Sequence, residues 1–275
     1  MSINRSRLFQ LFKYTVYVLL AINVYLFFAE ESLAARVQFP LGVPLEDTIL
    51  AFAATIDTAA WVVLLLMFEL ETYVLEDHHF SPLVSWSLQG VRIICYGFIV
   101  YAFYGYVIYL SFINQAVPYT GLVEICALVA DGWSYAVDLG EYTQLTAANC
   151  NSFSDAGIFF RFNDMLAVVD TQGLNDIRNL AWTDVINAAV WLLVVLVLEV
   201  DVRLQEHNRF EGFALRASNV AKFVLYSLLL IAAIYWGVKG DFVDFWDAFL
   251  WLVAFVFIEL NVFEWRQESH EAIAT

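Results

Sequence analysis

Three tryptophans in the sequence are each followed, eight residues later, by a glutamate near the end of a long apolar block. Two positions beyond each glutamate stands another polar residue. Rings of carboxylates select cations and concentrate them along a membrane path. The spacing therefore predicts an ion-binding or gating cluster of five acids at one level of the molecule. The five acids are Glu69, Glu199, Glu259, Glu71 and Asp201.

A further polar residue stands four positions before each of these tryptophans. It precedes the glutamate by 12 residues, or roughly 18 Å along a helix, and so predicts a second polar tier deeper in the same path. The same offset turns an ideal helix by about 120°, so the two tiers need not share one face. In that case Asp57 would lie at the outer interface instead. The tier residues are Asp57, Asn187 and Asp247.

The alternate apolar blocks begin with their own repeated pattern, in which an amide, a basic residue and a tyrosine follow at offsets of three and four. The basic residues are Lys13, Arg92 and Lys222. Charges in membrane segments usually pair, so we expect these cations to pair with the glutamates. In a cation channel or carrier they would set the charge and orientation of those acids. In the alternative, the ion pairs are structural, and the protein is a non-transporting scaffold or an accessory subunit of a larger complex.

All four histidines follow the glutamate-containing blocks and stand beside acidic residues. Imidazole and carboxylate together are suitable ligands for a divalent transition metal. None of the four has the i, i+4 spacing of a helix-borne metal site, so we favour solvated polar residues over a metal centre. The weak candidates for metal ligands are His78, His79, His207 and His270.

Six apolar blocks must position these side chains, and 61% of the residues are hydrophobic, well above the value for a soluble domain. Each block has about the length that crosses a bilayer core of roughly 30 Å. The sequence predicts an all-α integral membrane protein, in which six transmembrane helices form three pseudo-repeated hairpins with one long exported loop. The expected spans are 11–29, 48–75, 88–113, 178–203, 217–238 and 242–265.

The corresponding organisation has four parts. Residues 1–113 hold the first three helices, residues 114–177 the exported loop domain, residues 178–265 the last three helices, and residues 266–275 a cytoplasmic tail. Nine Lys and Arg residues fall on the side of the N-terminus and four on the other side. Because basic residues favour the cytoplasm, we expect both termini inside, in the inner (plasma) membrane of a bacterium.

Two of the three cysteines, Cys126 and Cys150, lie in the predicted exported loop, and Cys95 lies inside the third apolar block. Disulfides persist in oxidising compartments. The loop cysteines therefore predict a disulfide that closes a small domain, with two free thiols as the alternative.

Charge and motifs exclude several classes of protein. A formal net charge of −16 argues against nucleic-acid binding, which requires clustered Lys and Arg. The sequence carries no phosphate-binding loop, HExxH, CxxC or GxSxG motif, so nothing in it indicates an enzyme. We expect the lipid bilayer as the environment, a homo-oligomer or a membrane complex as the assembly, and no cofactor besides a bound cation.

Overall fold

The computed structural model describes residues 5–71, 82–122, 124–153, 157–163, 165–206 and 212–255. The chain forms two compact units. The first unit combines Met1–Asn23 with Asn187–Thr275, and the second is Val24–Ile186.

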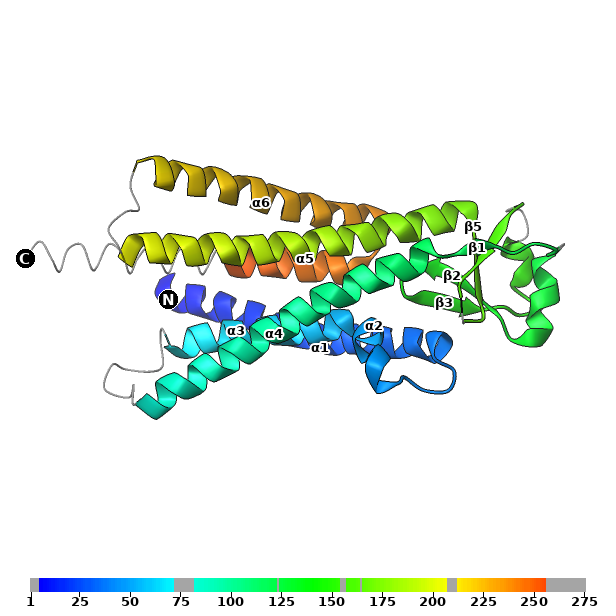
Figure 1. Cartoon of the computed structure of the whole chain (residues 1–275), viewed down its shortest axis with the longest axis horizontal. Coiled ribbons are helices and arrows are strands. Elements are labelled where there is room, and N and C mark those ends of the chain that lie inside the picture. Colours follow the sequence, from blue (N-terminus) through cyan, green and yellow to red (C-terminus); the bar gives the residue numbers. More distant parts are fainter. Residues whose placement is uncertain are drawn as a thin grey trace, which may run out of the picture. The chain divides into compact units, whose positions relative to one another are not determined.

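Four helices are long and apolar enough to cross a membrane: α1 (Arg5–Gln38), α4 (Pro82–Asn114), α5 (Thr171–Glu206) and α6 (Phe213–Lys239) (Figure 1). A fifth span arises if one bent pair counts as a single crossing. Residues 242–255 are also helical, and the rest of the predicted sixth span lies outside the described residues. Four or five spans are therefore confirmed as candidates, and the arrangement of six spans in three hairpins stays a prediction.

The bent pair breaks the second predicted span near its start. The one-turn helix η1 (Leu45–Asp47) and helix α2 (Thr48–Ala51) meet helix α3 (Ala53–Glu69) at an angle of 78°. The first N–H groups of a helix lack partners within that helix. Here the Glu31 carboxylate of α1 accepts hydrogen bonds from the N–H of Ala54 at 2.8 Å, and from the N–H and the hydroxyl of Thr55. A side chain from another helix thus caps α3 where the chain bends.

Helix α4 packs along α3 and α2, and Gly105 marks its closest approach. A Cβ atom at this position would lie 2.9 Å from the Ile49 side chain, 2.9 Å from the Ile49 carbonyl oxygen and 3.2 Å from the Ala53 Cβ. Both residues, Ile49 of α2 and Ala53 of α3, belong to the broken pair at its bend. Glycine is therefore needed here for contact between helices rather than for a turn.

We expect Gly105→Ala to lower the free energy of unfolding by about 1–3 kcal/mol, because the added methyl group forces the Ile49 backbone to move. Gly97 on the same helix is a matched control, since a Cβ there would meet nothing within 4 Å. Thermal unfolding of the two variants in detergent measures the difference. Equal melting temperatures for Gly105→Ala and Gly97→Ala would contradict the close approach.

The all-α prediction is wrong for the long loop, which folds into a five-stranded sheet between α4 and α5 (Figure 1). We call residues 117–170 the disulfide domain. Its strands run in the order β1-β4-β5-β2-β3, and only the β2–β5 pair is parallel. The strands have two to five residues each, too short to give a periodic signal. They are β1 (Val117–Pro118), β2 (Ser134–Asp138), β3 (Glu141–Gln144), β4 (Phe159–Arg161) and β5 (Ala167–Asp170).

Both faces of this sheet are covered, which follows from the alternation of side chains along a strand. Ala167 and Val169 of β5 face one core, together with Ile113 at the end of α4 and Leu174 at the start of α5. Val168 faces the opposite core. That second core also holds buried residues of β2, β4 and the 3-10 helices η4 (Ile125–Asp131) and η5 (Cys150–Phe153). The domain therefore has its own hydrophobic interior and is anchored to the ends of both long helices.

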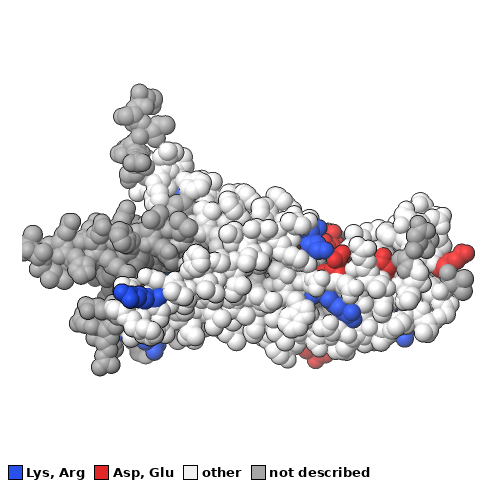
Figure 2. All heavy atoms as spheres, turned by 90° about the horizontal axis from the view of Figure 1, so that it is seen from above, with Lys and Arg blue, Asp and Glu red and all other residues white. Residues whose placement is uncertain are grey.

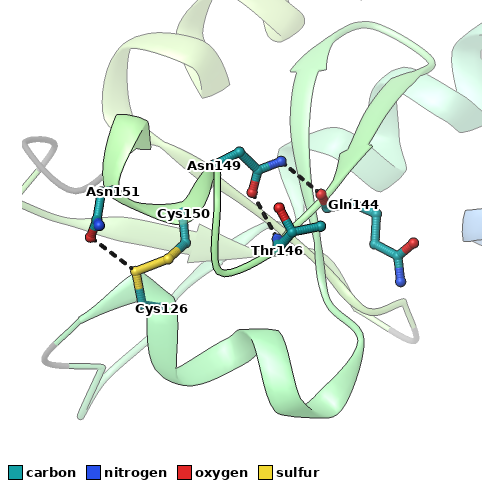
Figure 3. Close-up of a disulfide and its surroundings, with 6 residues drawn as sticks. All are labelled: Cys126, Gln144, Thr146, Asn149, Cys150 and Asn151. Atoms are coloured by element: carbon teal, nitrogen blue, oxygen red, sulfur yellow. Dashed lines mark hydrogen bonds between the residues drawn. A yellow bond between two sulfur atoms is a disulfide. The ribbon is translucent and has the colours of Figure 1, made fainter.

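The predicted disulfide is confirmed: Cys126 of η4 is bonded to Cys150 of η5, 24 residues further along (Figure 3). Asn149 closes the turn in front of Cys150. Its side-chain oxygen accepts a hydrogen bond from the N–H of Thr146 at 2.7 Å, and its amide group donates to the Gln144 carbonyl at 3.0 Å. Cys95 is a buried free thiol in α4.

Asp170 joins the sheet to α5. As the residue before Thr171 it caps the helix, because its Oδ1 accepts a hydrogen bond from the N–H of Gly173 at 2.6 Å. Asp170 also lies beside the phenol of Tyr135. Burial, followed by the charge of Asp170, raises the pKa of Tyr135 to about 12.

This shift predicts how the disulfide domain responds to alkaline pH. The phenol ionises near pH 10 in an unfolded chain and at about 12 in the folded domain. The neutral phenol thus contributes stability that is fully present below about pH 10 and is lost as the pH rises through about 12. We expect Tyr135→Phe to show a smaller alkaline loss of stability than the parent protein, measured by resistance to proteolysis across this range. Tyr142, whose pKa burial also raises, is unchanged in both proteins. Parallel alkaline losses would contradict the assignment to Tyr135.

Candidate functional sites: helix-end ion pairs and a buried polar group

Two of the predicted acids, Glu71 and Asp201, lie in ion pairs. In the unit Val24–Ile186, Glu71 accepts two hydrogen bonds from one guanidinium nitrogen of Arg92, at 2.9 and 2.7 Å. The Arg92 side chain is about one-third exposed and the Glu71 side chain about one-quarter. The pair links the residues just after α3 to the first third of α4.

An equivalent pair occurs in the other unit. The Lys222 ammonium of α6 lies 3.0 Å from Asp201 Oδ2 of α5, and the Ser218 hydroxyl donates to the same oxygen at 2.7 Å. Asp201 is buried, with 4% of its surface exposed. In both units the acid precedes its basic partner by 21 residues. This agreement is what a repeated helical hairpin predicts.

Glu199 does not share this environment. Its carboxylate is more than half exposed and pairs with Arg203 of the same helix at 2.9 Å. Two residues turn a helix by about 200°, so Asp201 faces α6 while Glu199 faces away from it. The sequence identified Arg92 and Lys222 as pairing residues but not their partners, and the pairing of Lys13 stays a prediction. Arg92 and Lys222 bind the second acid of each repeat, Glu71 and Asp201.

The remaining acids of the predicted cluster, and the third predicted basic residue, lie in different surroundings. Glu69 is buried, with 6% of its surface exposed, and Glu259 lies outside the described residues. Lys13 is buried at 3% exposure, and its ammonium lies 5.0 Å from the centre of the Tyr14 ring. Glu69 and Glu199 belong to different units. The ring of carboxylates therefore stays a prediction.

The four histidines offered as metal ligands also lie outside the described residues. Within the ranges that the structure describes, no three His, Cys, Asp or Glu side chains are grouped as a metal ion would require.

Asp247 of the predicted second tier lies in a buried polar group of the first unit. Its Oδ1 accepts a hydrogen bond from Asn23 Nδ2 of α1 at 2.9 Å, and the Trp251 indole, one turn further on, is another partner. Asn23 is completely buried. Asn23 was not predicted from the sequence, although an asparagine alone in an apolar run is a signal of a buried polar contact. Asp57, the tier residue of the first hairpin, belongs to the other unit.

Asn187 stands at the same level as Asp247. Figure 1 shows α5 and the helix 242–255 beside each other, joined by α6, which runs in the opposite direction. The two flanking helices therefore run the same way. Their tryptophans, Trp191 and Trp251, touch edge to face, with ring centres 6.5 Å apart. Asn187 and Asp247 each precede these tryptophans by four residues, about one helical turn. The structure thus aligns two of the three predicted tier residues.

Charged residues occupy little of the molecular surface in the view of Figure 2, where most described atoms over the helices belong to neither acidic nor basic residues. Large apolar side chains are exposed along the long helices, including Phe223, Ile231 and Ile93. Such an apolar surface is suited to contact with lipid hydrocarbon rather than with water.

Comparison of the chain with family models, with curated proteins and with solved structures finds no match.

Proposed function

We propose that the protein is a non-transporting membrane scaffold or accessory subunit that holds the disulfide domain on the exported side of a bacterial plasma membrane. One observation carries this proposal. Two of the five acids that would make a cation path attractive, Glu71 and Asp201, are engaged in equivalent ion pairs with Arg92 and Lys222. Paired charges fix neighbouring helices and offer little to a passing ion.

The disulfide domain also supports a scaffold function. Disulfides persist in oxidising compartments, which agrees with the orientation expected from the basic residues. The domain has its own core and a covalent closure, more structure than a connection between two helices requires. Its surface also exposes single large apolar residues, including Val137, Ile158 and Leu166. We assign it the role of binding a protein partner of the same membrane or of the exported compartment.

The test compares ion flux and partner contact in the same protein. We expect purified protein in liposomes to move Na⁺ and H⁺ no faster than protein-free liposomes. A photoreactive residue at Ile158 is expected to give one discrete adduct in cells, and one at the lipid-facing position Phe223 is expected to give none. Flux in the parent protein that is abolished by the triple change Glu69→Gln, Glu199→Gln and Glu259→Gln would overturn the proposal.

The second candidate is a carrier for a small cation, and the Asn23–Asp247 pair favours it. Among the described residues, the side chains that hydrogen bond to Asp247 are those of Asn23 and Trp251, and neither is a cation. A carboxylate between apolar helices without a basic partner is costly and commonly marks an ion or proton path.

A further inference from the structure

Two acceptor oxygens in the buried polar group of the first unit lack a hydrogen-bond partner among the described residues. Asn23 uses its amide nitrogen on Asp247, but its own Oδ1 is buried and has no hydrogen-bond partner among the described residues. Asn187 Oδ1 is likewise buried and unpartnered there. Buried polar atoms nearly always find a partner, because an unsatisfied one costs about 1–3 kcal/mol. Two such oxygens at the level of one carboxylate indicate a missing positive or donating group.

The three side chains come from three different helices of this unit. Asn23 is on α1, Asn187 on α5 and Asp247 on the helix 242–255. The direct contact between Asn23 and Asp247 joins the first and third helices, and the Trp191–Trp251 contact joins the second and third helices. Apolar residues close in sequence on the same three helices, Leu20, Ala188, Val190, Ala248 and Leu250, are all buried. The group is therefore an oxygen-rich polar cluster between packed apolar helices.

We propose that Asn23, Asn187 and Asp247 bind one dehydrated monovalent cation of the Na⁺ class. Carbonyl and carboxylate oxygens are the ligands of hard cations. One carboxylate neutralises a single positive charge, whereas divalent ions in proteins usually take more than one carboxylate. The cation also gives both orphaned amide oxygens a partner. The site goes beyond the scaffold function, because binding does not require transport, and it names the ion class for the carrier alternative.

The obvious competitor is a proton on Asp247, which would remove the charge and donate one hydrogen bond, too few for the two amide oxygens. A bound cation and a bound proton make the stability of the protein depend on different conditions. A bound cation makes stability depend on the identity of the salt at fixed pH and ionic strength, while a proton makes it depend on pH alone.

The experiment measures thermal unfolding of the full chain in detergent, titrated with NaCl against choline chloride at constant ionic strength. We expect Na⁺ to raise the melting temperature by at least about 3 °C, K⁺ to raise it less, and choline not at all. Asp247→Asn is expected to remove the Na⁺ response. Asp241→Asn is the matched control: it makes the same chemical change six residues away, and asparagine still caps a helix start, so the response should persist.

Asn187→Ala keeps the proposal testable if Asp247→Asn does not fold, because it removes one ligand oxygen and leaves the Asn23–Asp247 bond intact. We expect it to raise the NaCl concentration for half-maximal stabilisation by at least about tenfold, since one of three protein ligands is lost. Equal stabilisation by Na⁺ and choline, or a response to pH alone, would overturn the site. Na⁺ stabilisation without flux would keep the site and reject the carrier, so the two hypotheses fail separately.

Discussion

Replacing Lys222 with methionine is expected to lower the free energy of unfolding by about 3–5 kcal/mol, because the Asp201 carboxylate would stay buried without its cation. Only 4% of Asp201 is exposed, so water cannot replace the ammonium. Ser218 would still donate one hydrogen bond to the carboxylate, which offsets part of the loss. Unfolding of the purified protein in detergent, followed by tryptophan fluorescence, measures the change.

The double variant Asp201→Leu, Lys222→Met tests whether the loss of stability comes from leaving one charge buried without its partner. Removing both charges replaces a buried ion pair with apolar groups, which is often neutral or stabilising, so the double variant should be more stable than Lys222→Met alone. Arg203→Gln is the matched control, because it breaks an exposed pair on the same helix and should cost less than about 1 kcal/mol. A double variant no more stable than Lys222→Met alone would contradict a buried ion pair between the two residues.

Removing the disulfide with Cys126→Ser and Cys150→Ala is expected to destabilise the disulfide domain by about 3 kcal/mol. The bond closes a loop of 24 residues, and a loop of that length restricts the unfolded chain by about this free energy. The long helices are expected to stay folded. The measurement is limited proteolysis of the region between Val117 and Asp170, compared with circular dichroism of the whole protein.

Reductant supplies the control for the disulfide variant. Dithiothreitol should make the parent domain as sensitive to protease as the variant and should leave the variant unchanged. Cys95 is the remaining thiol in both proteins. Protease sensitivity that does not change when the parent is reduced would contradict a stabilising role for the bond.

The sequence predicted the long apolar helices and the disulfide because each depends on local information. A run of about twenty apolar residues has few alternatives to a membrane helix, and Cys126 and Cys150 are the two cysteines of one loop. The sheet was missed for the opposite reason. Strands of two to five residues show no usable period, and the parallel pairing of Ser134 with Ala167 joins residues 33 positions apart.

The candidate site was predicted in part. The repeat pattern identified Arg92 and Lys222 correctly as pairing residues, but spacing alone does not say which of two nearby acids faces the next helix. Asp201 does so because it lies about 200° from Glu199 on α5. The tier residues Asn187 and Asp247 were found from their distance to tryptophans. Asn23 belongs to no repeat, and the three-dimensional contact with Asp247 assigns it to the same polar group.

The direct passage from β5 to α5 has a mechanical consequence. Asp170 is both the last residue of the strand and the cap of the helix, so no flexible loop separates the two elements. Leu174 and Ile177 of the first helical turns also share a core with Ala167 and Val169 of the strand. A torque on the sheet is therefore transmitted to α5 and is not absorbed in a linker. A partner that binds the sheet and rotates it would therefore also rotate the first turns of α5.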